Sequence, residues 1–304
     1  MQSLFNIINK PLGWLLETLA GFFGGNFAAG VFVFTLLINV ILIPLSIKSQ
    51  KSSVQQTRIK PKLDELKKRY GDDRQKYSQA MQELYREENI SAGGGCLPML
   101  LRLVLMMSIY YLIMQPLTYL MHIDSEIISE AAAALGVTTR GTELQIIGAV
   151  ESGAIDFPQI AEKLGTVDFN FLGMNLTETP SFSFDIFNDA QLIWLMPVIA
   201  FACQMLTSVL SMRSQKKINP NAPNMMGMML TMPLITLFIG FSLPGGVAFY
   251  WACSSLVGGL IQLGIQNFYG PHIMISRERS NDLKKQCEFE ELRMKKAINN
   301  QDNE

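Results

Sequence analysis

The segment Cys96-Leu-Pro-Met-Leu-Leu-Arg102-Leu-Val-Leu-Met-Met-Ser-Ile-Tyr-Tyr-Leu-Ile-Met114 is almost wholly apolar, yet it contains an arginine. The apolar run continues to about Met121, and about 20 apolar residues are enough to cross the hydrocarbon core of a bilayer. An arginine inside such a helix costs roughly 3 kcal/mol on insertion scales. Eleven Leu, Ile and Val residues between Leu97 and Leu120 offset that cost. The pattern predicts a membrane-spanning helix in which Arg102 has a functional role.

The composition agrees with a membrane protein. The chain has 304 residues, of which 49% are hydrophobic and 17% are charged, whereas soluble domains are about 25% charged. Several windows of about 20 residues carry no charge, which favours membrane spans over a large soluble domain. The four cysteines have no metal-type spacing and do not suggest a disulfide framework.

Five segments reach spanning length: residues 27–47, 96–121, 191–212, 225–243 and 247–265. The last two are separated by Pro244-Gly245-Gly246, which is a strong turn signal. We therefore expect two antiparallel helices there rather than one long span. The predicted fold class is an all-α integral membrane protein with five transmembrane helices.

The distribution of charge predicts the orientation. Residues 48–92 carry eleven Lys and Arg, and the short loop 213–224 carries three without any acid. Residues 122–190, named here the acidic segment, carry two Lys and Arg against eleven Asp and Glu. By the positive-inside rule, residues 48–95, the loop and the tail 266–304 are cytoplasmic, while the N-terminus and the acidic segment lie outside.

Residues 1–26 are amphipathic and lack the basic start and the A-x-A site of a signal peptide. Trp14 and the apolar face predict a helix lying in the outer membrane interface. An uncleaved signal-like segment is the alternative interpretation of the same residues.

Residues 48–95 favour a cytoplasmic helical hairpin, with Gly71-Asp72-Asp73 as its turn and Asp73 as the cap of its second helix. A highly charged, solvated loop is the alternative. The tail 266–304 has mixed charge, which is consistent with contacts to anionic lipid, with an RNA-rich partner such as a ribosome, or with disorder. In the acidic segment, helical patterns cover Ser125–Leu135, Glu143–Glu151 and Phe157–Leu164, and we find no catalytic constellation there.

Polar residues inside the spans are candidates for a shared cavity. Asn39 and Arg102 each lie roughly 8–13 Å from the predicted cytoplasmic boundary. The full set of candidates for a substrate groove is Arg102, Asn39, Gln204, Thr207, Ser208, Ser255 and Gln262. Most such side chains can instead bond their own helix or join two helices. Because the five predicted spans contain no carboxylate, water is the expected partner of Arg102, which implies a hydrated cavity open to the cytoplasm.

Several motifs, in order along the chain, resemble the YidC family of membrane protein insertases, which is related to the mitochondrial Oxa and chloroplast Alb insertases. They are Leu42-Ile-Pro44-Leu-Ser-Ile-Lys48, Pro61-Lys-Leu-Asp-Glu-Leu-Lys-Lys-Arg-Tyr70, Leu84-Tyr85-Arg-Glu-Glu-Asn, Gly94-Gly-Cys96-Leu-Pro98-Met-Leu-Leu, and Phe249-Tyr250-Trp251 followed by Gln262. The large N-terminal domain of Gram-negative members is absent, so the chain resembles the short form typical of Gram-positive bacteria. The family usually has an arginine at the position of Asn39 and a glutamine at the position of Arg102.

The resemblance implies a bacterial plasma membrane insertase and chaperone that needs neither cofactor nor metal and is not an enzyme. Its implied partners are nascent membrane proteins and lipid, with the ribosome and the Sec translocon as further candidates. The acidic tail of a client would pair with Arg102 in the groove. A small-molecule transporter is a rival interpretation, but it predicts a coupling carboxylate or histidine and an inverted repeat, neither of which is visible. A non-catalytic assembly partner is a second rival.

Overall fold

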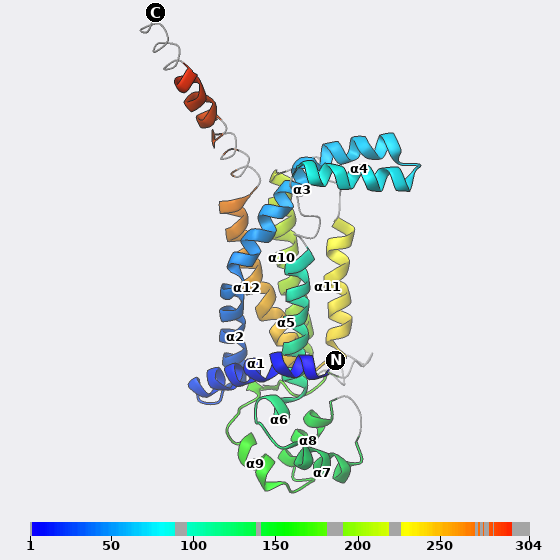
Figure 1. Cartoon of the computed structure of the whole chain (residues 1–304). Helices are drawn as coiled ribbons and strands as arrows, with labels where there is room; N and C mark the ends of the chain where they lie inside the picture. Colours follow the sequence, from blue (N-terminus) through cyan, green and yellow to red (C-terminus); the bar gives the residue numbers. More distant parts are fainter. Residues whose placement is uncertain are drawn as a thin grey trace, which may run out of the picture. The chain divides into compact units, whose positions relative to one another are not determined.

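The computed structural model describes residues 2–88, 96–137, 141–180, 191–218 and 226–270, together with residues 273, 276, 280, 281 and 283–293. The described chain is mostly helical (Figure 1). It divides into two compact units: unit 1 comprises Met1–Ile43, Cys96–Arg213 and Ala222–Ile261, and unit 2 comprises Pro44–Gly95, Ser214–Asn221 and Gln262–Glu304.

Three stretches of the described chain qualify as membrane spans by length and composition. Leu192–Arg213 and Gly245–Tyr269 each qualify alone. A third qualifies if α2 (Phe27–Ile41) and the start of α3 (Ile43–Tyr70) form one broken span. The break falls at Leu42, next to a helix start that Pro44 favours, because proline fits the first turn, where a backbone N–H has no helical partner. The sequence predicted a span over residues 27–47, and the structure interrupts the helix within it at Leu42.

Two further apolar helices are shorter in their described parts. These parts are Leu103–Met114 of α5 (Cys96–Met114) and Thr231–Gly240 of α11 (Met226–Gly240). The sequence predicted that the span containing Arg102 runs to Met121, but α5 ends at Met114 and a separate short helix, α6 (Pro116–Tyr119), follows. Pro116 explains the break, because its ring drives Gln115 out of the helical region, to φ −130° and ψ 59°.

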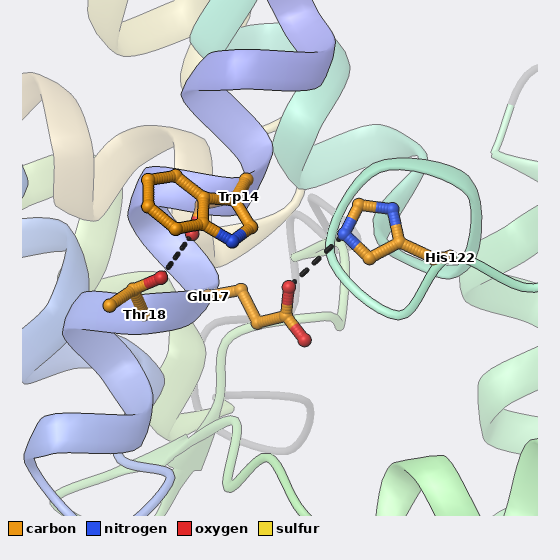
Figure 2. A network of polar contacts seen from close by, with 4 residues as sticks. All are labelled: Trp14, Glu17, Thr18 and His122. Atoms are coloured by element: carbon orange, nitrogen blue, oxygen red, sulfur yellow. Dashed lines mark hydrogen bonds and ion pairs between the residues drawn. The ribbon is translucent and has the colours of Figure 1, made fainter.

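Helix α1 (Gln2–Phe22) packs against α2, α5 and α6 within unit 1. Leu16 and Ala20 are fully buried on one face, while Ile7, Trp14 and Phe22 are exposed on the other. Figure 2 shows a second attachment of α1, in which Glu17 Oε2 lies 3.1 Å from Nε2 of His122. The Thr18 hydroxyl in the same view donates to the Trp14 carbonyl at 2.8 Å. Helix α1 is therefore amphipathic, and a polar contact ties it to the chain that follows α6.

The described residues of the acidic segment, 122–137 and 141–180, fold as three helices and a short strand pair. The helices are α7 (Ser125–Leu135), α8 (Thr142–Glu151) and α9 (Pro158–Leu164), so the three helical patterns in the sequence are confirmed. Gly136 ends α7 in the left-handed conformation at φ 64°, which is a common helix stop. The sequence analysis missed the antiparallel pair β1 (Asn170–Phe171) and β2 (Met174–Asn175).

The strand pair belongs to a strap, residues 168–178, which is bonded to two helix starts. The Asp168 carbonyl accepts from the N–H of Phe27 at 2.9 Å, where α2 begins. The N–H groups of Gly245 and Gly246 donate to Glu178 and Leu176, each at 2.8 Å, where α12 (Gly245–Tyr269) begins. The strap therefore joins the first residues of α2 and α12.

Unit 2 contains most of α3, together with α4 (Arg74–Glu87). Asp73 caps α4, its carboxylate accepting from the N–H of Lys76 at 3.1 Å, which confirms the predicted cap. This bond and the nearby Lys76 ammonium lower the pKa of Asp73. Lys62 of α3 forms an ion pair with Glu88, just beyond α4.

Candidate functional site

A cavity of about 880 Å³ lies within unit 1. Its walls come from α2, α5, α11, α12 and α10 (Leu195–Ile218), and from α7, α8 and the residues that join these elements. Figure 1 shows the helices that contribute to it. Most lining residues are apolar or aromatic, among them Tyr110, Tyr111, Tyr250 and Trp251. A large apolar cavity with a few polar groups is typical of a ligand site.

Three predicted groove residues line this cavity: Asn39, Gln204 and Ser255. The side-chain amide of Asn39 donates to the Thr35 carbonyl of its own helix at 2.8 Å. Its carbonyl oxygen faces Gly258 of α12, where an added Cβ would lie 3.3 Å away. Asn39 is therefore held by its own helix and presents its oxygen to the wall opposite.

Gln204 joins α10 to α11. The Thr236 hydroxyl lies 2.7 Å from Oε1 of Gln204 and 2.8 Å from the Pro233 carbonyl. It can donate its hydrogen bond to either oxygen. Thr236 and Ser254 also line the cavity. The sequence marks both as polar residues within spans, but does not separate them from hydroxyls that bond their own helix.

Thr207, Ser208 and Gln262 were predicted in the groove but are absent from the cavity wall. The Thr207 hydroxyl donates within its own helix, to the carbonyls of Cys203 and Gln204 at 3.1 and 3.0 Å. Its methyl group packs against α12 at Gly259, where an added Cβ would lie 2.3 Å from it. Ser208 lies one residue further along α10. Gln262 belongs to unit 2, where its amide donates to Oε1 of Gln50 at 3.1 Å.

Arg102 lies on α5, and its side chain falls outside the residues whose side chains the structure describes. Its backbone precedes Leu105, the first α5 residue of the cavity wall, by about 4.5 Å along the helix axis. The predicted role of Arg102 in the groove therefore remains a prediction.

Glu143 is the cavity residue that the sequence analysis missed. It lies in the first turn of α8 in the acidic segment, yet it lines the cavity and is only 7% exposed. Its carboxylate accepts from the hydroxyl of Thr118 at 2.6 Å and from the backbone N–H of Thr118 at 3.1 Å. Burial raises the pKa of Glu143, and these hydrogen bonds only partly oppose the rise. The sequence offers only one signal for this placement, namely an acid at the start of a helix.

The apolar helices and the cavity among them define a helical membrane protein. Residues 18–271 match the family described as 60Kd inner membrane protein, and the chain belongs to that family.

Relatives of this chain are named as insertases. It is 25% identical to the membrane protein insertase YidC of Fusobacterium nucleatum over 86% of this chain and 96% of the relative. It is 26% identical to the membrane protein insertase YidC 2 of Listeria innocua over 95% of this chain and 79% of the relative. A shorter match, 43% identical, covers 37% of this chain and 21% of the membrane protein insertase YidC of Methylococcus capsulatus. The chain thus spans about a fifth of that relative's length.

Proposed function

We propose that this protein is a membrane protein insertase and chaperone. The observation that carries the proposal is the 880 Å³ cavity among apolar helices, into which Asn39, Gln204 and Ser255 place polar groups. Membership of a family whose relatives are named insertases supports the same activity.

In this proposal the chain crosses the membrane five times, with helices α2, α5, α10, α11 and α12 as spans. The N-terminus and the acidic segment face outward, α3 and α4 form a cytoplasmic hairpin, and the tail is cytoplasmic. The excess of Lys and Arg in residues 48–92 and 213–224 supports this orientation. Helix α1 then lies in the outer interface, with Trp14 and Phe22 toward lipid.

A nascent apolar segment enters the cavity from the cytoplasm, and its short polar or acidic tail crosses to the outside. The few polar groups on the cavity wall give the tail hydrogen-bond partners as it loses bulk water, which lowers the barrier to crossing. Arg102 supplies a positive charge near the cytoplasmic end of the path and pairs with an acidic tail. The ribosome and the Sec translocon are candidate partners in delivery.

The proposal is tested with the Arg102→Ala variant in proteoliposomes. Insertion of a single-span client with an acidic tail is expected to fall about tenfold. This factor corresponds to ~1.4 kcal/mol, in the range of a hydrogen bond to a charged group. Adding Asn39→Arg to the variant is expected to restore insertion, because the charge returns to the facing helix. Protease protection of the client's tail is the measurement.

Arg213→Ala is the matched control, because Arg213 is an exposed arginine near the far end of α10. It should insert the client at the wild-type rate. Photocrosslinking from position 102 to a stalled nascent chain gives a direct check. An Arg102→Ala protein that inserts acidic-tailed clients at the wild-type rate shows that the electrostatic role is wrong.

A further inference from the structure

Glu143 is the one charged side chain among the described residues of the cavity wall. It comes from the acidic segment, and Thr118 holds it at the end of the cavity near α8. Thr118 lies in the first turn of α6, where backbone N–H groups have no helical partner, so the carboxylate also caps that short helix. Both of its oxygens are therefore fixed in direction.

The backbone that carries Glu143 is firmly anchored. Ile146 and Ile147, one turn further along α8, are both fully buried in the core of unit 1. Gly141 precedes α8 at φ 85°, and an added Cβ there would lie 3.6 Å from Cε of Met114. The carboxylate is thus held by the packing of α8 and does not sit on a solvated loop.

Glu143 has neutral hydrogen-bond donors but no basic partner among the described residues. The groups that stabilise its charge are the Thr118 hydroxyl and the N–H groups of Thr118 and Leu117. Arg102 lies on the preceding part of α5, about 18 Å from Met114 along the axis, and so belongs to the other end of that helix. A buried carboxylate with dipoles alone around it lacks a countercharge, which a cation that reaches it with good hydrogen-bond geometry supplies.

The remaining cavity wall suits the body of such a cation. Aromatic rings of Tyr111, Tyr250 and Trp251 line the cavity, together with methionine and isoleucine side chains. Aromatic faces attract ammonium and guanidinium groups, and apolar side chains accept an alkyl stem. The cavity therefore combines an apolar chamber with an acid at one end.

We propose that the α8 end of the cavity is a cation site, in which Glu143 binds the ammonium or guanidinium group of an apolar segment. The segment's identity as a client rests on the proposed insertase function, whereas the cation site itself does not. In an insertase, this site selects segments whose leading end carries an α-amino group, a lysine or an arginine. Acidic residues behind that leading end are free to pair with Arg102, as in the proposed function.

The test is direct binding to the full chain in phosphatidylcholine nanodiscs. The probes are two dansylated apolar peptides that differ only in a terminal Lys or Glu, with dansyl fluorescence as the readout. The wild type is expected to bind the Lys peptide at least fivefold more tightly than the Glu peptide. In Glu143→Gln, which keeps an oxygen for Thr118, the ratio is expected to fall below twofold.

Two further variants separate charge recognition from a purely structural cap. Thr118→Ala removes a hydrogen bond to the carboxylate but leaves the charge, so the preference for Lys should remain. Glu151→Gln makes the same chemical change on the same helix, outside the cavity wall, and should also keep it. The proposal is overturned if the wild type shows no preference, or if Glu143→Gln keeps it.

Insertion of two clients, one with a terminal Lys and one with a terminal Glu, is measured in parallel. A preference for Lys that depends on Glu143, combined with no insertion of either client, supports the cation site and refutes the insertase function. Insertion of both clients at rates that Glu143→Gln does not alter, without a binding preference, refutes the cation site and leaves the insertase function standing.

Discussion

At the scale of single residues, Glu143 links the acidic segment to the cavity and makes stability depend on pH. Burial raises the pKa of Glu143 above its ordinary value of 4.5, so the folded chain binds this proton more tightly than the unfolded chain does. Stability from this group is therefore lost as the pH rises from about 4.5 through the raised folded pKa. The Glu143→Gln variant lacks this titration.

We accordingly expect the melting temperature of Glu143→Gln to rise relative to the wild type over a pH range that begins near 4.5 and extends upward. Thermal melts of the purified protein, monitored by circular dichroism in a neutral detergent, measure the difference. Glu126→Gln, an exposed carboxylate in the first turn of α7, is the control for a charge change in the same segment. A difference that stays constant across this range contradicts the assigned pKa direction.

Residues that act through their own neighbours were predictable, whereas those that act through distant contacts were not. Asp73 was recognised as a cap because its acceptor role depends on the next three residues. Glu143 and Thr118 are 25 positions apart, and no local pattern indicates that the acidic segment folds back onto the cavity. Thr207 and Ser255 look alike in sequence, yet only Ser255 faces the cavity, because rotation about the helix axis is set by packing.

At the scale of elements, the contact between α10 and α12 depends on Gly259. An added Cβ there would lie 2.3 Å from Cγ2 of Thr207 and 3.0 Å from its Cβ, so the two helices could not keep their present approach. We expect Gly259→Val to lower stability by about 1–3 kcal/mol, the usual cost of overpacking. The melting temperature of the purified protein is the readout.

Gly264→Ala provides the control on the same helix, because an added Cβ at Gly264 meets nothing within 4 Å. It should leave stability unchanged or raise it by up to about 1 kcal/mol through helix propensity. If Gly259→Val melts at the wild-type temperature, the close contact of α10 with α12 is not required.

The positions at which helices and strands begin and end were only partly predictable from the sequence. The helices of the acidic segment were predicted because a helical pattern is a local signal. The breaks at Leu42 and Gln115 were missed although Pro44 and Pro116 stand beside them, because apolarity alone suggested continuous spans. The pair β1 and β2 has two residues in each strand, too few to give an alternating pattern.

At the scale of the whole molecule, the proposed orientation can be tested with a natural cysteine. Cys287 in the tail is exposed and free. A membrane-impermeant maleimide should fail to label it in intact cells and should label it after lysis, because the tail is expected in the cytoplasm. In a chain from which all four native cysteines are removed, the cysteine introduced by Ser152→Cys at the end of α8 should be labelled in intact cells. Labelling of Cys287 from outside would reverse the proposed topology.

The strap, residues 168–178, constrains how the cavity can widen. Backbone hydrogen bonds attach it to Phe27 at the start of α2 and to Gly245 and Gly246 at the start of α12, and both helices line the cavity. These bonds fix the separation of the two helix starts, and among the described residues the strap forms no backbone hydrogen bond further along either helix. Any separation of α2 from α12 is therefore smallest at the strap and grows with distance from it, so the strap acts as a hinge for the two helices.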